Sequence, residues 1–95
     1  MRLVFDEKAL ADLDVIRQWI SAESPKSADA VIERLLAECL TLIVFPKMGR
    51  VGKEPGTREL AVIEYPYLIV YRLAGDDVVI VGIPHTSLGR DPEPA

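Results

Sequence analysis

Most of the side chains that could carry chemistry lie in the second half of the chain. Guanidinium and ammonium groups bind phosphate or carboxylate, and histidine exchanges a proton near neutral pH. A cluster of this composition could bind an anion. It could also cleave RNA, with the cations stabilising the transition-state charge while the histidine moves a proton. The candidate target-binding residues are Lys47, Arg50, Lys53, Arg58, Arg72, His85 and Arg90.

Each of these residues also has an ordinary structural interpretation. Arg72 could pair with Glu59 or Glu64 across a sheet, and Arg58 could pair with a carboxylate on a helix. His85 could cap the edge of a sheet, and the loop lysines are expected to be solvated surface groups. The residue types therefore define candidates for a site, and the fold must decide which of them lie together.

Other common chemistries lack their sequence patterns. The chain has no P-loop, GxGxxG, CxxC, HExxH or GxSxG motif. A single histidine and a single cysteine, far apart in the chain, predict no metal site and no cofactor. Ser87, two residues after His85, is interpreted as a solvated turn serine and not as a nucleophile.

The charge balance argues against nucleic acid as the main partner. The net charge is −4, whereas a protein that grips a nucleic-acid backbone usually presents a basic face. Only residues 46–75 are positive, with five Lys/Arg against three Asp/Glu, or +2. We expect contact with nucleic acid only indirectly, or in the case of RNA cleavage.

Size and composition predict one globular domain. The 95 residues suffice for a single core, which we expect to span residues 1–90 with a frayed tail at 91–95. The apolar runs are too short to span a membrane, and the start of the chain does not resemble a signal peptide. The lone Cys39 cannot form an internal disulfide, so we expect a small core residue in a cytoplasmic protein.

Two amphipathic helices are predicted in the first half. Asp6 is a suitable N-cap for a helix from Glu7 to Ala22, and Ser24 with Pro25 restarts a helix that ends at Val44. The short connection predicts an antiparallel hairpin. The apolar stripe of the first helix is Leu10, Leu13, Val15, Ile16, Trp19 and Ile20, with Asp12, Asp14 and Arg17 on the solvent side. That of the second helix is Ala28, Val31, Ile32, Leu35, Leu36, Cys39, Leu42 and Ile43.

Strands are predicted on both sides of this hairpin. Residues 2–5 could form an edge strand, and residues 58–63, 67–73 and 78–83 form an antiparallel meander. The loop 46–56 holds three glycines and two prolines, which exclude regular structure there. The predicted fold is α+β, with the helical hairpin packed on a small antiparallel sheet.

Five short segments, in this order and spacing, resemble the ParE/RelE toxin superfamily of type II toxin–antitoxin systems. The likeness spans nearly the whole chain, to about Pro92, and implies the fold predicted above. The segments are Phe5 with Ala9-x-x-Asp12-Leu13, Pro46 with Gly49-Arg50, Gly56-Thr57-Arg58-Glu59-Leu60, Pro66-Tyr67-Leu68-Ile69-Val70-Tyr71-Arg72, and Val81 with His85.

Two activities are known on this scaffold. RelE-like members are ribosome-dependent mRNA endoribonucleases, whereas ParE-like members poison DNA gyrase. The resemblance favours the ParE branch, because segments 56–60 and 66–72 match it best, the chain is acidic, and Thr86-Ser87 replaces a tyrosine after His85. An RNase would use Arg50, Arg58, Arg72 and His85. The segment 86–92 departs from the family pattern at Leu88-Gly89, where a more basic ending is usual.

The resemblance also implies a cognate antitoxin that neutralises the toxin. We expect the antitoxin to cover an apolar groove left by the helical hairpin and the exposed edge of the sheet. Three hypotheses follow: a gyrase inhibitor without chemistry of its own, an RNase, or a degenerate toxin that survives as an antitoxin-binding module.

Overall fold

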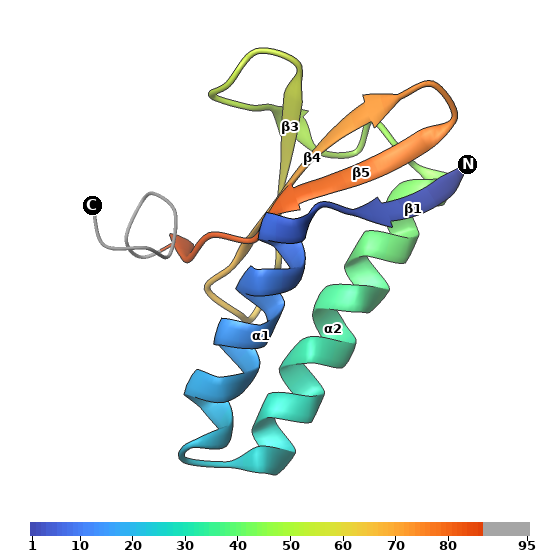
Figure 1. The fold of residues 1–95 in the computed structure, drawn as a ribbon. Coiled ribbons are helices and arrows are strands. Elements are labelled where there is room, and N and C mark those ends of the chain that lie inside the picture. Colours follow the sequence, from blue (N-terminus) through green and yellow to red (C-terminus); the bar gives the residue numbers. More distant parts are fainter. Residues whose placement is uncertain (87–95) are drawn as a thin grey trace.

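Two antiparallel helices form one layer of the fold. A computed structural model describes residues 1–86 of the chain. Helix α1 (Glu7–Ser21) and helix α2 (Pro25–Val44) lie side by side and are joined at one end (Figure 1). The hydroxyl of Ser24 accepts the backbone N–H of Ser27 and caps α2, with Pro25 at its first turn.

The second layer is a five-stranded mixed sheet in the order β1-β5-β4-β3-β2. The strands are β1 (Arg2–Phe5), β2 (Arg50–Val51), β3 (Thr57–Ala61), β4 (Leu68–Ala74) and β5 (Asp77–Gly82). Strands β2 to β5 are antiparallel neighbours. Strand β1 pairs with β5 in parallel, so the sheet is mixed and not wholly antiparallel as the sequence predicted.

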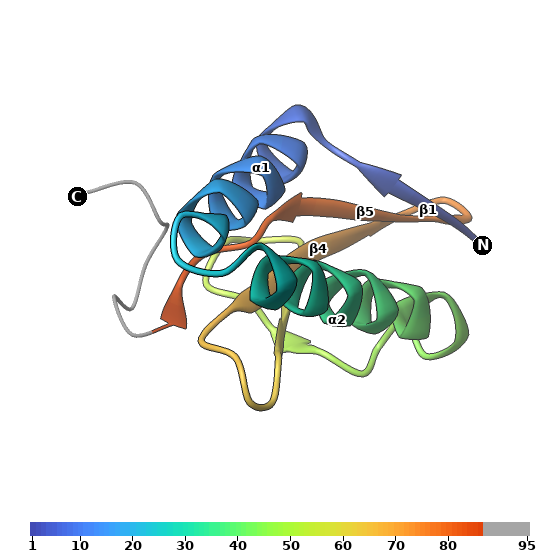
Figure 2. The same cartoon turned by 90° about the horizontal axis from the view of Figure 1, so that it is seen from below.

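The core lies between the hairpin and one face of the sheet. The helices pack mainly on β5 and β1, as Figure 2 shows from the end of the hairpin. Leu35, Cys39 and Leu42 of α2 are fully buried, and so are Ile69 and Tyr71 of β4. Burial of these side chains is the main stabilising contribution to a domain of this size.

The predicted elements are largely confirmed, but several residues differ from their expected roles. Residues 50–51 form strand β2 inside the loop that was expected to lack regular structure, because Arg50 pairs with Glu59 of β3. Asp12 is buried, although its position predicted a solvated residue. Trp19, by contrast, is 78% exposed and does not join the core.

Further apolar residues of the predicted helix stripes lie at the surface. Leu10 and Val15 of α1 and Leu36 of α2 are exposed, because each helix contacts the sheet or its partner over a narrower arc than the stripe covers. The predicted tail 91–95, together with Ser87 and Arg90, falls outside the described residues. No described helix is long and apolar enough to cross a membrane.

Candidate functional site

The loop after α2 is held by the hydroxyl of Tyr71. Its O–H donates to the carbonyl oxygen of Pro46 at 2.7 Å, and its oxygen accepts the backbone N–H of Gly49 at 3.0 Å. A Cβ at position 49 would lie 2.7 Å from the same oxygen, so only glycine allows this approach. The core residue Tyr71 thereby fixes where the loop leaves the hairpin.

Arg58 acts on the same loop. Its guanidinium donates to the carbonyl oxygen of Gly49 at 2.7 Å and to that of Lys47 at 3.4 Å. The alternative of a helix carboxylate as the partner of Arg58 is therefore wrong. Its guanidinium is committed to the backbone, as expected of a residue that positions a loop.

Glu59, the residue after Arg58 in β3, carries a buried carboxylate. It accepts the backbone N–H of Lys53 at 3.1 Å and a guanidinium nitrogen of Arg50 at 3.4 Å. Glu59 is thus paired with Arg50, and Glu64 is paired with Arg34 at 2.8 Å, so both carboxylates considered for Arg72 have other partners. Because a buried charge needs compensation, the Glu59 carboxylate fixes Arg50 and Lys53 on one side of the sheet.

His85 stands at the opposite end of β4. It forms an isolated antiparallel bridge with Tyr67, and the two rings meet edge to face with centroids 5.3 Å apart. The backbone N–H of Thr86 donates to the carbonyl oxygen of Pro66 at 2.7 Å, and that of Leu68 donates to Pro84 at 2.9 Å. His85 therefore lies where β4 begins, in the interior of the strand order, and not on an edge strand of the sheet.

Asp12 holds the end of β5 from the helical side. Its carboxylate accepts the backbone N–H of Ile83 at 2.8 Å and pairs with the ammonium of Lys8 at 3.2 Å. These contacts place Lys8 next to the segment that leads to His85. The partner of Asp12 lies 71 residues away in the chain, so no local pattern could have revealed this role.

One hollow collects several of the predicted candidates. We call it the open-face cavity, because Leu68 and Val70 line it from β4 while their neighbours Ile69 and Tyr71 face the helices. Its volume is about 670 Å³. It is lined by Lys8, Arg50, Lys53, Glu54, Thr57, Glu59, Ala61, Leu68, Val70, Val81, Gly82, Pro84, His85 and Thr86.

The cavity joins only part of the candidate set. Arg50, Lys53 and His85 line it, but Lys47, Arg58 and Arg72 do not. Arg72 is five residues beyond Tyr67, the bridge partner of His85, which corresponds to about 16 Å along a strand. Of the four residues required for an RNase, Arg50 and His85 thus line the cavity, whereas Arg58 and Arg72 do not.

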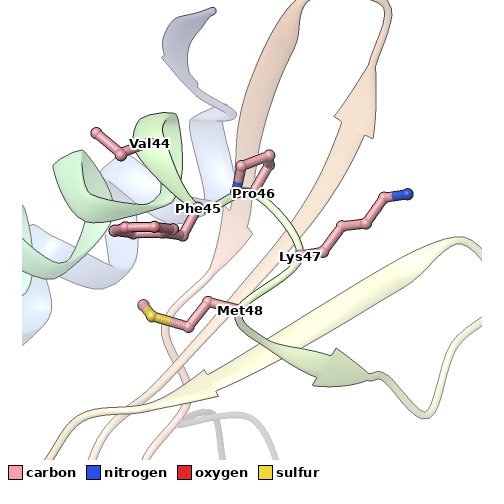
Figure 3. Close-up of a pocket in the computed structure, with 5 residues that line it drawn as sticks. All are labelled: Val44, Phe45, Pro46, Lys47 and Met48. Carbon is pink, nitrogen blue, oxygen red and sulfur yellow. The ribbon is translucent and has the colours of Figure 1, made fainter.

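A second hollow, of about 600 Å³, is apolar and lies where α2 ends. It is lined by Val44, Phe45, Pro46, Lys47 and Met48. The side chains of Phe45 and Met48 point to the same side, and Lys47 points away from them (Figure 3). Phe45 and Met48 are exposed, so this corner presents apolar surface to a partner.

Burial changes the acidity of two groups near the core. Burial raises the pKa of the Cys39 thiol to about 12, with a further contribution from the nearby Glu38 carboxylate, so Cys39 is no nucleophile at neutral pH. Burial also raises the pKa of the Tyr67 phenol. Among residues 1–86, no group of three or more His, Cys, Asp or Glu side chains is placed to hold a metal ion.

Comparison with known proteins identifies the family. Residues 3–88 match the family described as the ParE toxin of the type II toxin–antitoxin system parDE. The chain belongs to the ParE toxin family. The matched range includes both the loop anchored by Tyr71 and the segment that ends at His85.

Relatives carry the names of both branches of the superfamily. Toxin RelE2 of Caulobacter vibrioides is 37% identical over 86 residues, covering 90% of this chain and 96% of its own. Toxin ParE3 of the same organism is 34% identical over 85 residues, covering 86% and 83%. This ParE-family chain is therefore similar to toxins of either name.

Solved structures of the superfamily share the fold. A chain of the chromosomal ParDE system from P. aeruginosa superposes with a TM-score of 0.79 at 26% identity, covering 90% of this chain and 95% of that one. A chain of the intact E. coli RelBE toxin–antitoxin complex gives 0.60 at 20% identity, covering 86% and 92%. The predicted α+β fold is thus confirmed.

Proposed function

We propose that this ParE-family toxin inhibits DNA gyrase by binding, without chemistry of its own. One observation favours gyrase inhibition over RNA cleavage. Arg58 lies opposite Tyr71 and Arg72 is the next residue of β4, four and five positions beyond the bridge between Tyr67 and His85. The Arg58 guanidinium already donates to two loop carbonyl oxygens. A general acid and the cations that stabilise the reacting charge must converge on one phosphate.

A cognate antitoxin would neutralise this toxin. The similar chain from P. aeruginosa belongs to a ParDE system, and surfaces suited to a partner are exposed here. Leu36 and Leu40 of the hairpin are exposed apolar residues, and β1 is an edge strand with one side unpaired within the described sheet. An exposed strand edge accepts a further strand.

An mRNA endoribonuclease is the second candidate. Arg50, Lys53 and His85 line the same open-face cavity, which is the observation in its favour. If this candidate holds, His85→Ala abolishes RNA cleavage. Full cleavage by that variant would exclude His85 from the mechanism.

Induced expression of the chain without its antitoxin separates these candidates. We expect growth arrest with filamentation, an SOS response and intact mRNA. Rapid translation arrest with cleaved mRNA would overturn the gyrase proposal in favour of the RNase. Soluble protein without any effect on growth would leave a degenerate module that only binds an antitoxin.

A further inference from the structure

The open face of the sheet, which the helices leave uncovered, carries ion pairs that share one orientation. The pairs are Lys8 with Asp12, Arg50 with Glu59, and Arg2 with Asp77. The first two contribute lining residues to the open-face cavity. The third joins β1 to β5, and alternation along β5 places Asp77 on the same face as Val81, which lines the cavity too.

In each of these pairs the cation is the more exposed partner. The exposed fractions of the cationic and the carboxylate side chain are 80% and 25% for Arg2 and Asp77, 47% and 10% for Lys8 and Asp12, and 75% and 8% for Arg50 and Glu59. A molecule that approaches the open face therefore meets guanidinium and ammonium groups before it meets carboxylates.

The register of the sheet adds Arg72 to this face. Side chains alternate along a strand, so Arg72 shares a face with Leu68 and Val70, which line the cavity. Its partner in β3 is Thr57, another lining residue. Arg72 is exposed and forms no ion pair within residues 1–86, so it places an uncompensated positive charge beside the cavity.

The ion pairs of the helices have a different orientation. Asp29 is more exposed than its partner Arg17, and Glu64 is more exposed than its partner Arg34 on α2. Arg34 and its second partner Glu38 are exposed about equally. The helical side therefore shows carboxylates to the solvent, whereas the open face shows cations, although the net charge of the chain is −4.

These cations are spread too widely for one small anion. Arg2 lies on β1 and Arg50 on β2, the two outer strands of the five-stranded sheet. With about 4.8 Å between strands, they are about 19 Å apart across the sheet. An extended segment of about six residues covers this distance at about 3.3 Å per residue. The cavity, with Leu68, Val70 and Val81 in its lining, offers space for an apolar side chain of such a segment.

We propose that the open face binds an extended, acidic segment of a partner protein, with one apolar side chain of that segment in the open-face cavity. Nucleic acid suits this face less well, because single strands bind by stacking their bases on aromatic side chains. No Phe, Tyr or Trp among residues 1–86 lines the cavity, and the ring of His85 already meets that of Tyr67 edge to face. The inference rests on the proposed function in one respect, because DNA gyrase would supply the segment.

Synthetic peptides test the chemistry of the occupant. Three short peptides share a central Leu-Val pair, and their flanks are glutamate, lysine or serine. We expect the glutamate peptide to bind the full chain in a 1:1 complex by calorimetry, and the lysine peptide to bind least. Higher ionic strength should weaken the glutamate peptide, since exposed charges are screened. A single-stranded oligouridylate of equal charge should bind more weakly than the glutamate peptide.

Matched charge reversals locate the binding site. Arg72→Glu should weaken binding of the glutamate peptide by about five- to tenfold and strengthen binding of the lysine peptide. The control is Lys26→Glu at the start of α2, another exposed cation without an ion pair within residues 1–86. It changes the net charge equally and should alter the affinity by less than about twofold. Both positions are exposed, so neither variant should unfold.

Purified DNA gyrase separates this inference from the proposed function. We expect the parent protein to inhibit supercoiling, Arg72→Glu to inhibit it more weakly, and Lys26→Glu to match the parent. If the parent leaves gyrase active while the glutamate peptide binds in a manner that depends on Arg72, the proposed function fails and the site for an acidic segment stands. If the parent and both variants inhibit gyrase equally, the proposed function stands and the open face is not the contact.

Three results with the probes would overturn the inference. Equal binding of all three peptides, or binding of none, would exclude recognition of acidic side chains. Tighter binding of the oligouridylate than of the glutamate peptide would make nucleic acid the occupant. Self-association in light scattering that Arg72→Glu abolishes would place the helical side of a second copy on the open face instead.

Discussion

Neighbouring residues of β4 face opposite sides of the sheet and meet different surroundings. Ile69 and Tyr71 are fully buried under the helices, while Leu68 and Val70 line the open-face cavity. The covered face is held by apolar packing. On the open face, the Glu59 carboxylate accepts the backbone N–H of Lys53 and a guanidinium nitrogen of Arg50.

The two faces of this small sheet therefore have different roles: the covered face stabilises the fold, and the open face positions the candidate binding residues. Removing apolar volume under the helices should unfold the protein, because the core is the main source of stability. Removing a polar contact on the open face should change where Arg50 and Lys53 lie, with less effect on the fold. Substitutions on the two faces therefore test the division directly.

The largest effect is expected for Leu35→Ala. Leu35 is fully buried in the core, and its truncation should lower the unfolding free energy by about 2–5 kcal/mol. Leu40→Ala, at an exposed position of α2, should change it by about 0.5 kcal/mol or less. Urea unfolding followed by circular dichroism measures both free energies, and equal losses would contradict the exposure of Leu40.

An intermediate effect is expected for Tyr71→Phe, because this residue joins the two regions. The ring stays in the core, but Pro46 and Gly49 lose their partner. We expect a loss of about 1–3 kcal/mol and faster hydrogen exchange at the Gly49 amide. Tyr65→Phe is the control, since its hydroxyl makes no hydrogen bond within residues 1–86. Unchanged exchange at Gly49 would show that the loop is held by other contacts.

Helices and strands that are marked by capping residues, prolines or a hydrophobic pattern could be predicted from the sequence. The second helix was predicted from Pro25 to Val44 and has these bounds, because Ser24 caps one end and Pro46 follows the other closely. The strands differ from their predicted bounds by one or two residues at their ends. The fold class followed from these elements and their order.

Contacts between distant segments could not be predicted. Strand β2 forms because Arg50 meets Glu59 across a loop whose glycines and prolines indicated no structure. Asp12 has the polarity of a surface residue, but it caps the end of β5 at Ile83. The candidate cations were found by residue type, but which of them line the cavity depends on strand pairing that no local pattern shows.

A smaller effect is expected for Glu59→Gln. The amide oxygen of glutamine can still accept the Lys53 N–H, but the charge opposite Arg50 is lost. We expect a destabilisation of about 1 kcal/mol, with faster exchange of the Lys53 amide. Glu54→Gln, at an exposed position in the same cavity, is the control. A loss as large as that of Leu35→Ala would mean that the open face also carries the stability of the fold.

The smallest effect is expected at the edge of the sheet, for the exposed pair Arg2 and Asp77. The Arg2 guanidinium bonds to Asp77 at 3.1 Å and holds the pKa of that carboxyl below its ordinary value of 3.8. A lowered pKa stabilises the fold above pH 3.8, and this contribution disappears as the pH falls through the folded-state value. Asp77→Asn should therefore be slightly less stable than the parent near neutral pH and equal to it in acid, with the difference reduced by salt because the pair is exposed.

Asp76→Asn, whose carboxylate makes no ion pair within residues 1–86, should show no such dependence. A difference between parent and Asp77→Asn that persists below pH 3.8 would show that packing at the β1–β5 edge, and not the ion pair, is responsible.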